Sequence, residues 1–320
     1  MQNHKYVLAI PAYGGKLGGF EKTLLSQYKQ EFSNKFKIAS DILGKKLEPR
    51  WLIEKNASEL SELESLQMTH IFSCIIGNKI RQEYGNPLFI VGFSSGQLAG
   101  LYCNGNLSFE ETVQSISDIN AVVCDKFSPN QFEMVVITGL NDAEVACLCR
   151  NNGVYIANEN TVSSYSVIGE TLNIRQLTEA ALDSGAIGAT KLSVRLPFHS
   201  VWMEANRNEI KHFFNAMNVK KGVCPILSCV NQKTLTTKDQ VVDGIIDNIC
   251  SSVSWPKTVK KLSELGATTI FETGPGNSIS RMSRSYCTIK VHSPQLLLDT
   301  KCSVATEHRS CNLAGGNPVR

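Results

Sequence analysis

The chain has 320 residues, of which 42% are hydrophobic and 19% charged, enough to bury a sizeable core in one large domain or two ordinary ones. It carries 32 Lys and Arg against 29 Asp and Glu, a net charge of only +3. Both signs are scattered along the sequence, which argues against a nucleic-acid partner. No run approaches the roughly 18 apolar residues that a membrane span needs. We therefore expect a globular protein with neither nucleic acid nor membrane as partner.

The eleven cysteines predict neither disulfides nor a metal site. No apolar signal segment follows Met1 and the spacings show no disulfide framework, so we expect a cytoplasmic protein. Cys147 and Cys149 form a CxC pair, but no second Cys or His pair lies close to it, as a zinc site would require. We expect no metal, and we expect small core residues at Cys74, Cys103, Cys124 and Cys250.

The first elements alternate between strand and helix patterns. Tyr6 to Ile10 is a short apolar run closed by Pro11, which predicts a buried strand. The glycine cluster that follows has neither GxxxxGK[ST] nor GxGxxG spacing, so it predicts a tight turn and no nucleotide site. From Gln67 to Arg81 the apolar residues recur on one face of a helix.

In residues 128–198 the predicted elements become shorter, and strands and helices follow in the order βαββαβ, which is typical of a small ferredoxin-like sheet. Longer alternating units resume afterwards, beginning with a helix pattern from Met203 to Met217. We therefore expect a large domain formed by residues 1–127 and 199–296, with residues 128–198 inserted as a small subdomain. Residues 297–320 lose all periodicity and predict a flexible tail.

Gly92-Phe93-Ser94-Ser95-Gly96 is a GxSxG motif between a predicted strand and a predicted helix. This context favours a nucleophile elbow over a plain glycine turn, because the strained turn exposes the central serine. The turn would also place the backbone N–H of Ser95 at a helix start, where an oxyanion would form. We predict Ser94 as the nucleophile.

A serine hydroxyl needs a base whose pKa is near the working pH, and histidine is the expected one. Of six histidines, His199 directly follows a predicted strand at the boundary where the insert returns to the large domain. Spacing alone leaves two interpretations equally open, a catalytic base and a residue that only packs the loop.

With these motifs in place, the sequence resembles the malonyl-CoA:acyl carrier protein transacylases and the acyltransferases of polyketide synthases over about residues 5–290. The family's GHSxGE resembles Gly92 to Gln97, and its PFH loop resembles Pro197 to Ser200. Its TQPA resembles Leu66 to Thr69, and its IANxN stretch resembles Ile156 to Asn160. The GPG loop is found at Gly274 to Gly276.

The resemblance implies an α/β-hydrolase-like large domain, an inserted ferredoxin-like subdomain and ping-pong transfer through an acyl-serine. Ser94 would be the nucleophile and His199 its base, oriented by a backbone carbonyl at Asn248. The oxyanion donors would be the backbone N–H groups of Ser95 and Tyr13. Family positions also place Gln67 and Asn160 at the substrate pocket.

The sequence departs from the family where malonyl-using members have an arginine that binds the free carboxylate. A gapless reading from Ser94 places Ile119 there. A carboxylate against isoleucine in a dry pocket would remain unpaired, which disfavours malonyl substrates. Phe93 makes the expected pocket rim less polar, and Phe198 adds bulk, although core filling explains Phe198 equally well.

Three functions remain open from the sequence. The first is an acyltransferase that moves a neutral acyl group between coenzyme A and the phosphopantetheine of an acyl carrier protein, with no permanently bound cofactor. The second is a hydrolase that removes acyl groups from carrier proteins, since water and thiol differ only in how they deacylate the serine. The third is a non-catalytic docking module that kept the fold.

Overall fold

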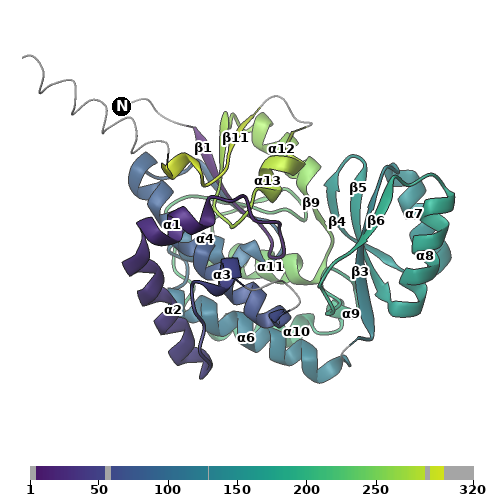
Figure 1. Ribbon diagram of the computed structural model, residues 1–320, viewed down its shortest axis with the longest axis horizontal. Helices are drawn as coiled ribbons and strands as arrows, with labels where there is room; N and C mark the ends of the chain where they lie inside the picture. The colour runs from purple at the N-terminus through teal and green to yellow at the C-terminus, as the bar shows by residue number, and fades with distance from the viewer. Residues whose placement is uncertain (1–4, 55–58, 129, 285–288, 299–320) are drawn as a thin grey trace, which may run out of the picture.

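The computed structural model describes residues 5–54, 59–128, 130–284 and 289–298, which form two sheets (Figure 1). The larger sheet has the strand order β11-β10-β1-β2-β7-β8 and is parallel except for β8 at its edge. Its strands are β1 (Tyr6–Ile10), β2 (Phe89–Gly92), β7 (Ile226–Leu227), β8 (Thr234–Leu235), β10 (Thr269–Glu272) and β11 (Lys290–His292).

Strand β1 is apolar throughout because the sheet is covered on both faces. Tyr6, Leu8 and Ile10 belong to one hydrophobic cluster, while Val7 and Ala9 belong to another. The first cluster includes residues of α2 (Lys29–Leu43) and α4 (Glu62–Tyr84), and the second includes residues of α12 (Trp255–Glu264). The sheet is therefore a central layer between helices.

The remaining helices of the large domain connect these strands. Two of them, α6 and α11, begin with a capping box, in which side chain and backbone at the helix start satisfy each other's hydrogen bonds; α4 has another at Ser61 and Glu64. These remaining helices are α1 (Glu21–Gln27), α3 (Trp51–Glu54), α5 (Gly96–Asn104), α6 (Phe109–Lys126), α9 (Val201–Glu204), α10 (Arg207–Ala216), α11 (Lys238–Cys250) and α13 (Ser278–Met282).

The smaller sheet stands beside the large domain, with α7 and α8 on its outer side (Figure 1). Its elements follow the predicted order: β3 (Phe132–Thr138), α7 (Asp142–Asn152), β4 (Tyr155–Thr161), β5 (Ser164–Glu170), α8 (Thr171–Asp183) and β6 (Gly188–Lys191). The strand order is β6-β3-β5-β4, and these four strands are antiparallel. A fifth strand, β9 (Val253–Ser254), joins β4 from the large domain and ties the two parts together.

Four details differ from the sequence-based expectations. The last strand of the insert ends at Lys191, so residues 192–198 form a connecting segment. The predicted helix from Met203 to Met217 is divided into α9 and α10. Leu297 is only 2% exposed and packs in the core, so the predicted tail does not start there; residues 299–320 lie outside the described part of the chain. Cys124 is exposed, because it lies on the outer side of α6.

Candidate active site

A sharp turn joins β2 to α5 and presents Ser94. The backbone of Ser94 is left-handed, with φ of 54°, a strained conformation for a residue with a side chain. The flanking glycines allow the close approach of the turn: a Cβ at Gly92 would lie 2.3 Å from Cα of Gln97, and one at Gly96 would lie 2.3 Å from the carbonyl oxygen of Ile10. The GxSxG sequence therefore forms a nucleophile elbow.

His199, which follows the inserted subdomain in the sequence, contacts Ser94, which precedes it. Its backbone is also left-handed, with φ of 60°, and its side chain is buried. The Nε2 atom lies 2.6 Å from Ser94 Oγ, while Nδ1 lies 3.1 Å from the carbonyl oxygen of Ser251. Because a carbonyl only accepts, Nδ1 carries the proton and Nε2 is left to accept from the serine hydroxyl. The pair is thus arranged for proton transfer from Ser94 to His199.

The C-terminal end of α11 holds His199: the carbonyl oxygen of Ser251 accepts from Nδ1 at 3.1 Å, and a backbone hydrogen bond with Asn248, the predicted residue, also acts on the ring. The last carbonyls of a helix lack partners within the helix, and several of them converge on the same loop here. The backbone N–H of His199 donates to the carbonyl oxygen of Ile249 at 2.9 Å. The backbone of Asn248 also acts on the ring, where it raises the pKa of His199.

Burial is the main influence on the charge of His199. Desolvation lowers its pKa to about 4, although the backbone carbonyls of Ser251 and Asn248 act in the opposite direction. The imidazole is therefore neutral at physiological pH and can accept a proton. When it does so, the carbonyls at the end of α11 stabilise the cation that forms.

Two backbone N–H groups lie near the serine. Ser95 precedes the first residue of α5, and its N–H has no hydrogen-bond partner in the described part of the chain. The backbone N–H of Tyr13, in the loop after β1, donates to Ser95 Oγ at 3.2 Å. The Tyr13 hydroxyl donates to the half-buried carboxylate of Glu62, which fixes the loop against the start of α4. These groups form a candidate oxyanion hole.

A cavity of about 130 Å³ opens beside the pair and lies between the two parts of the molecule. Its walls include Ser94, Ser95, His199, Tyr13, Ile119, Phe198 and Asn248, all selected from the sequence. The small subdomain adds Met134 from β3 and Asn158 from β4. No Lys, Arg, Asp or Glu is among the described residues that line it. The cavity wall therefore carries no charged side chain, and it is mostly apolar, with a few amide and hydroxyl groups and the imidazole of His199.

Three predicted pocket residues lie elsewhere. The side chain of Phe93 is 3% exposed and packs edge-to-face on Trp255 at 5.9 Å, because the turn that exposes Ser94 directs its neighbour into the core. Gln67 faces α6, where its Nε2 donates to the carbonyl oxygen of Val113 at 2.9 Å. Asn160 donates to Ser166 Oγ at 3.0 Å and does not line the cavity, since it lies two residues further along β4 than Asn158.

Asn158 is a polar cavity residue that was not predicted from the sequence. Its side chain is 8% exposed, and its Oδ1 has no hydrogen-bond partner in the described part of the chain. The signal was present, because residues two apart on a strand share a face and Asn158 belongs to the same IANEN stretch as Asn160. Which of the two asparagines reaches the cavity depends on how far the strand extends, and the sequence pattern does not give that.

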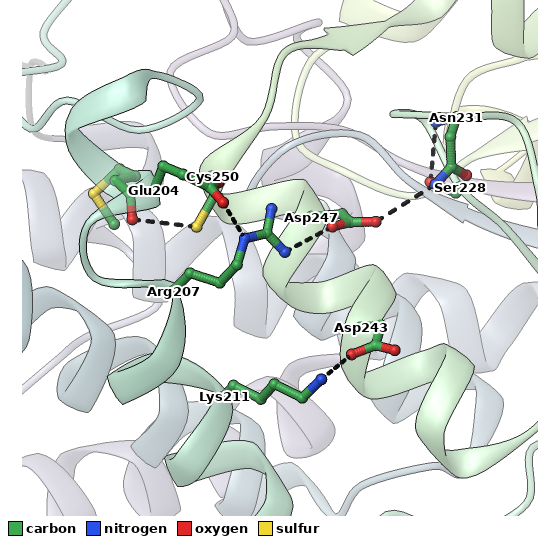
Figure 2. Close-up of polar contacts among 9 residues, drawn as sticks. Glu204, Arg207, Lys211, Ser228, Asn231, Asp243, Asp247 and Cys250 are labelled. Carbon is green, nitrogen blue, oxygen red and sulfur yellow. Dashed lines mark hydrogen bonds and ion pairs between the residues drawn. The ribbon is translucent and has the colours of Figure 1, made fainter.

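A polar network supports the end of α11 that holds His199 (Figure 2). Arg207 of α10 pairs with Asp247 at 2.9 Å and with Glu204 at 2.6 Å. Cys250 Sγ donates to the carbonyl oxygen of Met203 at 3.4 Å. The segment that follows His199 is therefore attached to the same helix end as His199 itself. One turn earlier on α11, a separate pair joins Lys211 and Asp243 at 2.6 Å (Figure 2).

No helix in the described part of the chain combines the length and the apolar character needed to cross a membrane. The same residues contain no group of three or more His, Cys, Asp or Glu side chains placed to hold a metal ion.

No protein-family model matches the chain, but comparisons with known proteins and with solved structures find similar ones. Malonyl CoA-acyl carrier protein transacylase from Bacillus subtilis is 26% identical over 304 residues, 92% of this chain and 95% of that protein. Polyketide biosynthesis protein ThaF from Burkholderia thailandensis is 24% identical over 284 residues, 87% of this chain and 24% of that protein. The solved structure of an acyl-carrier-protein-S-malonyltransferase from Bartonella henselae has a TM-score of 0.83 at 22% identity, covering 94% of this chain and 98% of that one. The predicted fold class is confirmed.

The low pKa of His199 determines how the modification of Ser94 by a serine-directed reagent, such as a fluorophosphonate, should depend on pH. Only the neutral imidazole accepts the serine proton, and the pKa is lowered to about 4. The rate constant for modification of Ser94 should therefore stay level from neutral pH down to about one unit above that pKa, and fall below it. Tryptophan fluorescence at each pH controls for unfolding. A midpoint near the ordinary histidine pKa of about 6.5 would contradict this reading.

The polar network makes a second prediction. Asp247→Asn removes the charge that holds Arg207, so the carbonyls around His199 should be less well placed. We expect the modification rate of Ser94 to fall about two- to twelvefold, the factor for about 0.5–1.5 kcal/mol, which is the net contribution of a typical hydrogen bond. Asp243→Asn is the matched control, since it breaks an ion pair between the same two helices one turn away. Equal effects of the two substitutions would show that the network does not act through His199.

Proposed function

Since the chain is a relative of the malonyl CoA-acyl carrier protein transacylases, we propose that it is an acyltransferase that carries acyl groups between thioesters through an ester on Ser94. The observation that carries the proposal is the 2.6 Å contact between Ser94 Oγ and His199 Nε2 at a strained elbow. A docking module that had lost its chemistry would have no need to keep both residues in left-handed conformations.

In the first half-reaction, the Ser94 hydroxyl gives its proton to His199 Nε2 as Oγ attacks the thioester carbonyl carbon. The oxygen of the tetrahedral intermediate accepts hydrogen bonds from the backbone N–H groups of Ser95 and Tyr13, the latter exchanging its present contact with Ser95 Oγ. The C–S bond then breaks, and His199 passes the proton to the leaving sulfur. The products are a free thiol and an acyl ester on Ser94.

In the second half-reaction, another thiol gives its proton to His199 and attacks the ester, and the Ser94 hydroxyl is restored. The proposed donors and acceptors are coenzyme A and the phosphopantetheine arm of an acyl carrier protein, the partner in the name of the Bacillus relative. The name of the Burkholderia relative supports a setting in polyketide biosynthesis, beside fatty-acid biosynthesis. Attack by water in place of the thiol would release a free acid, which is the hydrolase alternative.

The acyl group is proposed to be neutral, although the relatives are named for malonyl transfer. Ile119 lies on the cavity wall, and none of the described lining residues is a cation. The free carboxylate of a malonyl group would enter this space without a charged partner, and an unpaired buried charge costs several kcal/mol. A neutral acyl group meets no such penalty.

Incubation with acetyl, longer acyl and malonyl thioesters tests the proposal by the mass of the intact chain. We expect a neutral acyl adduct that Ser94→Ala abolishes, and a malonyl adduct that is weaker. Addition of an acyl carrier protein bearing a free thiol should then move the acyl group onto it. No adduct with any thioester would overturn the proposal, and release of free acid without a new thioester would identify a hydrolase.

The substitution Ile119→Arg tests the neutral preference. A guanidinium at this wall would supply the bidentate partner that a carboxylate needs. We expect the ratio of malonyl to acetyl loading to rise at least about tenfold, the factor for about 1.4 kcal/mol. Ile119→Met, of similar volume and no charge, is the control. An unchanged ratio would show that residue 119 does not face the acyl group.

A further inference from the structure

We propose that the cavity selects apolar acyl groups of about six carbons, counting the carbonyl carbon. This inference rests on the proposed function and extends it from the charge of the acyl group to its size. It concerns the acyl group, which loading places on Ser94 at the wall of the cavity.

The volume of the cavity sets the size. An apolar cavity of about 150 Å³ in another protein accommodates one benzene molecule, which has six carbons. The cavity beside Ser94 and His199 measures about 130 Å³, slightly less than that. An acetyl group would leave most of this space unfilled, while a ten-carbon chain would have to displace the walls. A group of about six carbons fits best.

The walls favour such a chain over a short or polar one. Leu66 of α4 and Ile116 of α6 contribute from the large domain, and Met134 of β3 contributes from the small subdomain. Both Leu66 and Ile116 are at least nine-tenths buried, so these walls are fixed by core packing. Each methylene placed against such walls should speed loading about fourfold, the factor for about 0.8 kcal/mol. The gain ends where the cavity is full.

The test is a series of pantetheine thioesters with acyl chains of two, four, six, eight and ten carbons, and benzoyl as a compact group of similar size. Acid quenching and intact mass give the rate of acyl-enzyme formation for each. We expect the rate to rise from acetyl to hexanoyl, to fall by decanoyl, and to be high for benzoyl. Acetyl as the fastest substrate, or a rise that continues to decanoyl, would overturn the inference.

Substitutions in the cavity walls should move the optimal acyl-chain length in opposite directions. Leu66→Ala should shift it to longer chains, and Ile116→Phe should shift it to shorter ones. Leu172→Ala is the control, because Leu172 is 66% exposed on α8 and outside the cavity. Because Ile116→Phe can also fail by misfolding, Leu66→Ala is the decisive variant, and an unchanged optimum in it would contradict the inference.

Different results would contradict the proposed function and the inference about acyl-chain size. If no thioester loads Ser94 in the native chain, the proposed acyltransferase function is wrong. If thioesters load but the rate shows no optimum near six carbons, the function stands and only the size inference is wrong.

Discussion

The hydrogen bond between Ser94 and His199 is the interaction on which the rest of the structure depends. The two residues are 105 positions apart in the sequence, and the small subdomain is inserted between them. Each is held in a left-handed conformation, so each is positioned by its surroundings against a local preference. The sheet and α5 fix Ser94, while the end of α11 fixes His199. The large domain can be understood as the frame that brings these two strained loops together.

The electrostatics of the site follow from the same arrangement. A serine–histidine pair is commonly oriented by a carboxylate. Here the carbonyl of Ser251 takes that place, together with the backbone of Asn248, at a helix end that already carries partial negative charge. Burial keeps the imidazole neutral until it accepts the serine proton. The adjoining cavity has no charged wall among the described residues, so the proposed chemistry pairs a neutral base with a neutral acyl group.

Local patterns predicted the order of strands and helices and the turn at Ser94, because the GxSxG motif and the alternation of strands and helices are short-range features. Ser94 needed only its neighbours in the sequence. For His199 the sequence left two interpretations open, a catalytic base and a packing residue. The structure places its Nε2 atom 2.6 Å from Ser94 Oγ. Phe93 and Gln67 were expected at the pocket from the family positions that they match, but side-chain direction at a turn and on a buried helix depends on packing. The same holds for the carbonyl of Ser251, which the fold selects among several at the end of α11.

Peptide mapping of an acid-quenched acyl-enzyme shows directly whether Ser94 carries the acyl group. The chain would be loaded with hexanoyl pantetheine, digested and analysed by tandem mass spectrometry, with His199→Ala treated in the same way. We predict a hexanoyl ester on the peptide that contains Ser94, and none on that peptide in the variant. Hexanoyl found only on exposed thiols such as Cys124 and Cys147, equally in both proteins, would contradict the account.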